Sequence, residues 1–284
     1  MAREHSESGL VVGLVVADLA HVGLLAGVAA AILTAGAALL PDLDHPSATA
    51  ARTFGPVTKY IAQRLDHFGY WTWECTHTRY DRRPRDGHRT ITHTTVFAML
   101  AGVAFGAVAI AGMWAILAEL LVLTSLAVRG LAARGSRELR MGRGSGARVT
   151  VVVKRKRRRG RRFRITMVNV TAVGASLAAL IYTLDPALNP LLVGECVALG
   201  CWVHCLGDSL TLYGCPWLWP LTIKGQRWYL IGTPRLMRFR TGTDEFDGED
   251  RVRIMLHIGT IAAGIGLLPG AYPWIWQSAT AFIH

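Results

Sequence analysis

Long apolar stretches alternate with shorter polar and basic segments along this chain of 284 residues. Seven runs have a composition suited to apolar helices, at about residues 9–20, 22–40, 94–111, 114–133, 166–184, 190–212 and 252–270. A helix needs about 20 residues to cross a hydrocarbon layer of about 30 Å, so several runs are of full length and the first is short. The pattern predicts an all-α, polytopic membrane protein of about six to seven spans, with residues 1–284 forming a single integral membrane domain.

Composition and charge support this class and give the protein an orientation. Hydrophobic residues make up 51% of the chain, yet its formal net charge is +12, a combination typical of membrane spans joined by basic loops. Fourteen Lys and Arg residues lie in 134–164, which the positive-inside rule predicts to be cytoplasmic. Alternation then predicts cytoplasmic loops at 41–93 and 213–251. The expected outer turns, near 112 and at 185–189, contain no Lys or Arg.

The first apolar region, residues 9–40, allows two arrangements. It could form one long tilted helix, or a hairpin that turns at Asp18 to His21. A single helix would bury these ionisable residues and place the N-terminus outside, whereas a hairpin returns the N-terminus to the cytoplasm. Because ionisable groups inside a span are costly, the hairpin is favoured, although its first arm has only about twelve residues.

Two further features of the sequence could be functional signals. The run "KRKRRRGRRFR" at 154–164 has no aromatic platform beside it and directly precedes an apolar span, so it favours contact with anionic lipid over nucleic acid. The five cysteines form no CxxC pair and are predicted to be free, mostly buried thiols.

Three polar motifs fall on the predicted cytoplasmic side and carry metal-binding residue types. They are "LLPDLDHPSAT", with Asp42, Asp44 and His45; "GHRTITHT", with His88 and His93; and "WVHCLGDSLT", with His204 and Asp208. The last pair is spaced i and i+4, so both side chains share one helical face. Imidazoles combined with carboxylates suit zinc, manganese or iron, with one or two ions per chain.

Each motif also has a structural explanation. Asp42, Asp44 and His45 could cap a helix end, and His88 or His93 could be a solvated loop residue. An HxxxD pair within an apolar helix is harder to explain in this way, because ionisable pairs inside a membrane usually serve a function. The convergence of three motifs on one side therefore favours a metal site.

In their order and spacing, the three motifs resemble the YdjM-like family of predicted membrane-bound metal-dependent hydrolases, also described as LexA-binding and inner-membrane-associated. The resemblance runs from the N-terminus to about residue 250, with the basic loop 134–164 as a departure. It implies a further ligand, His5 in "EHSESG". His5 can reach Asp42 only if the N-terminus is cytoplasmic, so this ligand requires the hairpin. The resemblance also implies a glutamate after the third motif, for which Glu245 and Glu249 are both candidates.

The resemblance implies a hydrolase at the cytoplasmic membrane surface, and its His and Asp arrangement is similar to that of zinc-dependent phospholipases C and nucleases. We expect a bound divalent ion to lower the pKa of a water from about 15.7 towards about 7, for attack on an ester or phosphoester. A lipid head group is the natural substrate at this depth. Two other classes stay open: a scaffold or regulatory protein with a structural metal site, and a transporter with carboxylates near its span centres.

Within this hypothesis the candidate residues have different expected roles. His204, Asp208, His93 and Asp42 are expected to bind the ion, and His45 or His88 to complete the ligand set. Asp44 is expected to be a bridging ligand or the general base. Arg89 could hold a phosphate through its planar guanidinium, or could simply be a basic residue that anchors the topology.

Overall fold

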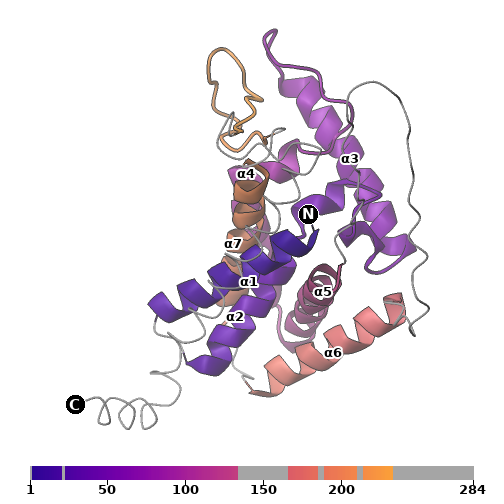
Figure 1. Ribbon diagram of the computed structural model, residues 1–284, viewed down its shortest axis with the longest axis vertical. Helices are drawn as coiled ribbons and strands as arrows, with labels where there is room; N and C mark the ends of the chain where they lie inside the picture. Colours follow the sequence, from indigo (N-terminus) through magenta and orange to yellow (C-terminus); the bar gives the residue numbers. More distant parts are fainter. Residues whose placement is uncertain (1, 21–22, 134–165, 185–188, 210–213, 233–284) are drawn as a thin grey trace, which may run out of the picture.

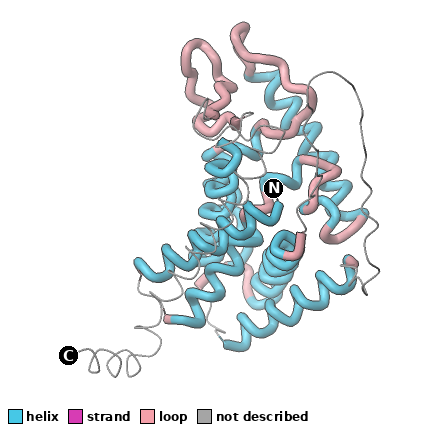
Figure 2. Tube along the Cα trace, in the orientation of Figure 1, coloured by secondary structure: helices cyan, strands magenta, loops and turns pink. Residues whose placement is uncertain are grey.

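The computed structural model describes residues 2–20, 23–133, 166–184, 189–209 and 214–232, and every regular element within them is helical. Figure 1 shows the arrangement of the helices, and Figure 2 shows the loops that connect them. The long helices are α1 (Ala2–Leu19), α2 (Leu24–Ala37), α3 (Pro56–Thr76), α4 (Thr95–Ala109), α5 (Met113–Leu131), α6 (Met167–Leu184) and α7 (Pro190–Ser209). Three short 3-10 helices, η1 (Pro41–Asp44), η2 (Ala50–Arg52) and η3 (Ile91–His93), lie between them.

The N-terminal region forms the expected hairpin, because α1 and α2 pack along each other. Close approach is possible at Gly9 and Gly13, where an added Cβ would lie 2.6 Å from the Thr34 carbonyl oxygen and 2.7 Å from the Ala31 Cα atom. The first arm is longer than the apolar run suggested, since α1 already begins in the polar segment at Ala2. This extension buries His5.

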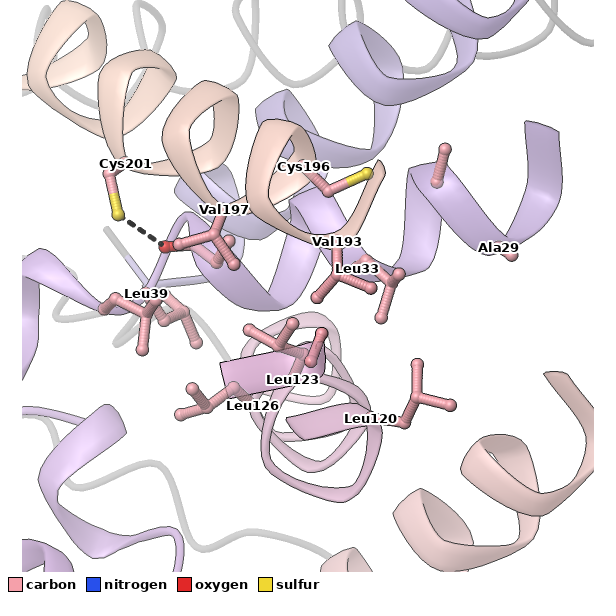
Figure 3. Packing of buried hydrophobic residues seen from close by; sticks show 14 of the residues in the cluster. Ala29, Leu33, Leu39, Leu120, Leu123, Leu126, Val193, Cys196, Val197 and Cys201 are labelled. Atoms are coloured by element: carbon pink, nitrogen blue, oxygen red, sulfur yellow. Dashed lines mark hydrogen bonds between the residues drawn. The ribbon is translucent and has the colours of Figure 1, made fainter. Parts of the chain in front are cut away.

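The apolar core lies between α2, α5 and α7 (Figure 3). Leu33 of α2, Leu123 of α5 and Val197 of α7 are fully buried there. Helix α4 packs mainly on α7, and α6 packs mainly on α5. Small residues permit the tightest contacts: a Cβ at Gly36 would lie 2.0 Å from the carbonyl oxygen of Leu123.

Four described helical segments are long and apolar enough to cross a membrane: Leu24–Asp44, Met113–Leu131, Met167–Leu184 and Pro190–Ser209. The apolar run 94–111 yields α4, which is shorter at 15 residues. The run 252–270 lies outside the described residues. Many outward-facing side chains on these helices, such as Val103 and Leu180, are apolar, as expected for helices in contact with lipid.

Sequence analysis did not predict α3, which lies within the segment 41–93 that was assigned as a loop. No long apolar run marks this helix, because charged and polar residues interrupt its apolar positions. It begins at Pro56 in the first turn, after Gly55 in a left-handed conformation with φ +62°. Its buried side packs on η1 and η2, and makes smaller contact with η3.

Besides the aspartates of the three polar motifs, the described spans contain two carboxylates: Glu119 of α5 is buried with one oxygen lacking a hydrogen-bond partner, and Glu195 of α7 is exposed. Neither belongs to the polar cluster described below.

The Gly36 contact gives a test of the packing. We expect Gly36→Ala to destabilise the protein by about 1–3 kcal/mol, because the new methyl group meets backbone atoms of α5 that cannot rotate away. Gly106→Ala is the matched control, since its nearest neighbour would lie at an ordinary 3.5 Å. Thermal unfolding in detergent should show a lower midpoint for the first variant only, and equal midpoints would contradict the packing.

Candidate metal centre

His204 and Asp208 lie on consecutive turns of α7, and both side chains are buried. The His204 Nδ1 atom is 2.8 Å from the carbonyl oxygen of Ala38, which can only accept a hydrogen bond. The proton is therefore assigned to Nδ1, and Nε2 presents its lone pair to the cluster. This nitrogen is 3.7 Å from Asp208 Oδ2.

His93, which lies just before α4, contacts both His204 and Asp208. It ends η3, and the next residue, Thr94, caps α4 by accepting a hydrogen bond from the Phe97 N–H at 3.1 Å. The His93 Nε2 atom lies 3.1 Å from His204 Nε2 and 3.4 Å from Asp208 Oδ2. Two imidazole nitrogens and a carboxylate oxygen thus converge in a fully buried position.

The N-terminal hairpin supplies two more side chains. Asp42, in η1 directly after α2, places Oδ1 3.8 Å from His204 Nε2. The His5 ring stacks on the His204 ring with centroids 3.9 Å apart, and its Nε2 is 3.4 Å from Asp208 Oδ1. The helical start of α1 therefore positions His5 beside residues that are about two hundred positions away in the chain.

Three overlapping groups of side chains have the geometry to hold a metal ion. They are His5, Asp42 and His204; Asp42, His88 and His93; and His93, His204 and Asp208. Within each group the ligand atoms lie within 4.8 Å of one another, and each pair of groups shares one residue. The donors are imidazole nitrogens and carboxylate oxygens, which fit one or two ions of the zinc, manganese or iron type.

Asp44 lies outside these three groups, but its carboxylate contacts two of their histidines, His88 and His93. Its carboxylate accepts hydrogen bonds from His88 Nδ1 at 2.7 Å, from the Arg89 backbone N–H at 3.1 Å and from the Thr92 hydroxyl. Its Oδ2 is also 3.4 Å from His93 Nδ1. A buried carboxylate in this position orients imidazole ligands and increases their basicity.

Arg89 contacts two buried carboxylates of the cluster, Asp44 and Asp208. Its backbone N–H binds Asp44, while its guanidinium donates to Asp208 Oδ1 at 3.0 Å and to the Gly214 carbonyl at 3.4 Å. Its backbone is left-handed, with φ +58°, a conformation that costs about 1–3 kcal/mol for a residue with a side chain. Such strain is concentrated at functional sites.

The remaining candidates lie at or beyond the edge of the cluster. The His45 ring stacks on the His88 ring at 4.7 Å, and its Nε2 is 3.0 Å from the Ser47 hydroxyl. His45 therefore contacts His88 from outside the three groups that could hold a metal ion. Glu245 and Glu249 lie outside the described residues.

The charges of the cluster favour a cation at its centre. Burial by itself lowers the pKa of His93, but the nearby Asp44 and Asp208 carboxylates outweigh this effect and raise the pKa to about 10. The two carboxylates therefore favour positive charge at this position, which is the charge that a bound cation would supply.

Sequence reasoning missed two parts of this arrangement. The Thr92 hydroxyl donates to the Asp44 carboxylate, but in the sequence Thr92 looks like an ordinary polar residue of "TITHT". The Ala38 carbonyl belongs to the backbone and has no sequence signal. Both become visible only once α2, η3 and α7 are packed together.

The fold and the cluster define a multi-span membrane protein with a buried His and Asp centre at one end of its apolar helices. The family model described as YdjM inner membrane protein matches residues 1–134 and 142–270, so the chain belongs to this family. The match extends past residue 250, and its one break, at residues 135–141, falls within the basic segment 134–164. Comparisons with curated proteins and with solved structures found no match.

Metal content tests the centre directly. We expect the purified protein to retain a divalent ion, and we expect His204→Ala and Asp208→Ala to lose it, because each removes a member of the buried group His93, His204 and Asp208. His67→Ala, on the exposed side of α3, is the control and should keep the ion. Elemental analysis provides the measurement, and a wild-type protein that takes up no divalent ion would disprove the site.

The position of Asp44 generates a separate prediction. Thr92→Val removes the hydroxyl that holds this carboxylate, and we expect metal affinity to fall by about 10- to 100-fold, as is usual for groups that support metal ligands. Thr92→Ser keeps the hydroxyl and should retain the affinity of the wild type. Competition with a chelating dye measures both values. Unchanged affinity in Thr92→Val would show that Asp44 does not act through this contact.

Proposed function

We propose that this protein is a metal-dependent hydrolase, which uses an activated water to cleave an ester or phosphoester at the cytoplasmic surface of the membrane. The observation that carries the proposal is the convergence of His93, His204 and Asp208 in one buried cluster, with Asp42 and His5 adjacent. Membership of the YdjM family is consistent with this proposal.

The residues of the cluster can be assigned to distinct tasks. His93, His204, Asp208 and Asp42 would hold the metal, and Asp44 would keep His88 and His93 correctly oriented. A bound divalent ion supplies Lewis acidity and a water whose pKa is lowered to about 7. The Arg89 guanidinium, which is partly exposed and already beside the cluster, would bind a phosphate oxygen of the substrate.

The number of donors favours catalysis over a closed site. A structural zinc ion is usually enclosed by four ligands, whereas a catalytic ion keeps one position for water or substrate. Six residues take part in the three overlapping groups, which is more than one closed tetrahedral site requires. The additional donor residues are consistent with two ions, or with one ion and neighbouring residues that transfer protons.

Charge supports the proposed orientation. The segment 134–164 has fourteen Lys and Arg residues, and 52–89 has eight. We infer that these segments and the N-terminus are cytoplasmic, so that the metal centre faces the cytoplasm. With α1 and α4 counted beside the four long spans, the described helices would cross the membrane six times.

A structural metal site in a scaffold or regulatory protein is the second candidate. The observation that favours it is the complete burial of His93 and His204, whose side chains have no exposed surface. A substrate would reach such atoms through the side occupied by Asp42, His88 and Arg89, which are partly exposed.

Hydrolysis by the metal-loaded protein tests the proposal. The purified chain would be stripped with a chelator, reloaded with zinc, manganese or iron, and offered p-nitrophenyl esters, bis-p-nitrophenyl phosphate and phospholipid vesicles. We expect turnover that requires the metal and that falls at least about 100-fold in Asp42→Asn, because this ligand borders the accessible side. His67→Ala should retain activity.

The second candidate predicts a different outcome. A structural ion would raise the thermal unfolding midpoint of the wild type without turnover on any of these substrates. That result would overturn the hydrolase proposal while leaving the metal centre in place.

A further inference from the structure

Helix α3 has three distinct faces, although it belongs to no apolar run of the sequence. Its buried face, with Thr58, Ala62, Gly69, Thr72 and Trp73, packs towards the short 3-10 helices near the metal centre. A polar face carries Lys59, Gln63, His67 and Glu74, all exposed. The third face is exposed but largely apolar, and no packing within the described chain explains it.

The residues of this third face recur at helical spacing along the whole length of α3. We call them the exposed stripe: Val57, Tyr60, Ile61, Arg64, Phe68, Trp71 and Cys75. The spacing of i, i+3, i+4, i+7, i+11, i+14 and i+18 keeps them on one side of the helix. Trp71 is 58% exposed and Phe68 is 49% exposed, which is unusual for large aromatic side chains in contact with water.

Positive charge accompanies the exposed stripe. The Arg64 guanidinium lies 5.0 Å from the Tyr60 ring centroid and donates to the Tyr60 hydroxyl at 3.0 Å. Arg79, Arg82, Arg83 and Arg85 follow the helix and are exposed. Two nearby acids are already engaged, since Asp66 accepts from the Gly87 N–H and Asp81 accepts from the Trp228 N–H. The surface around α3 is therefore basic as well as aromatic.

The position of α3 in the fold determines what can reach this stripe. The helix packs on η1, which is the last turn of the apolar segment Leu24–Asp44. It therefore lies where a membrane span ends, at the depth of the lipid head groups. In Figure 1 it lies at the periphery of the helical assembly. Tyrosine, tryptophan and arginine are the residue types that favour this boundary.

We propose that α3 is an interfacial helix, whose exposed stripe lies against the head groups and upper acyl chains of the membrane that the spans cross. The partner is a lipid surface, and anionic lipid is preferred because the surrounding arginines complement its charge. The apolar side chains of the stripe lose contact with water there, while Lys59, Gln63 and His67 remain in it. The proposal does not depend on hydrolysis or on a bound metal.

Native Cys75 provides a reporter for this contact. It is the exposed member of the five cysteines, and the other four are buried. A maleimide fluorophore on Cys75 would be studied in the full-length protein, reconstituted in phosphatidylcholine vesicles with or without phosphatidylglycerol. Cys75→Ser combined with Phe68→Cys gives a second reporter on the stripe. Cys75→Ser combined with Gln63→Cys gives the matched control on the polar face.

Quenching by two reagents separates the outcomes. We expect spin-labelled lipid to quench the reporters at Cys75 and Phe68→Cys several-fold more than the reporter at Gln63→Cys. Aqueous iodide should give the reverse order, and phosphatidylglycerol should increase the difference. Equal quenching of both faces by iodide would overturn the proposal, because the stripe would then be in water. Protection of the stripe from both reagents would also overturn it, and would indicate a protein partner or a second copy of the chain.

Metal content of each labelled variant would be measured in parallel. A protein without metal whose stripe still contacts lipid would refute the metal centre alone, whereas a metal-loaded protein with a water-exposed stripe would refute the interfacial helix alone.

Discussion

The hydrogen bond between His204 and the carbonyl oxygen of Ala38 is the contact on which the rest of the centre depends. It joins α7 to the end of α2 across 166 positions of the chain and directs the lone pair of His204 Nε2 towards the cluster. The contact requires the two helices to lie very close together. Gly200, one turn earlier in α7, permits this, because a Cβ there would lie 2.6 Å from the Thr34 carbonyl oxygen. The close packing of α2 and α7 therefore also sets the orientation of the His204 ring.

Around this bond, the cluster balances buried charges that would otherwise be costly. Asp44 and Asp208 are each surrounded by donors, and Arg89 contacts both of them through different atoms. Removing a carboxylate or a cation from such a buried network leaves its partners without compensation, which costs more than the net value of the interaction itself. A divalent ion is the natural completion of a site that combines these acids with several imidazoles.

Much of the architecture could be predicted from the sequence, and the reasons are local. The apolar runs identified α2, α4, α5, α6 and α7 because a membrane helix must be apolar over a length set by the bilayer. His204 and Asp208 could be paired from their i, i+4 spacing alone. Helix α3 could not be found by the same method, because its apolar residues are divided between a buried face and an exposed face and never form a continuous run.

By itself, the sequence determined the helical class, the approximate spans and the identity of the polar residues that gather at one end of them. These properties depend on composition and periodicity, which act over a few turns of helix. Only the tertiary structure decided that Asp44 stands behind His88 and His93, that Arg89 bridges two carboxylates, and that His5 stacks on His204. Such roles depend on distances between segments far apart in the chain, and those distances are set by how closely the small residues allow the helices to pack.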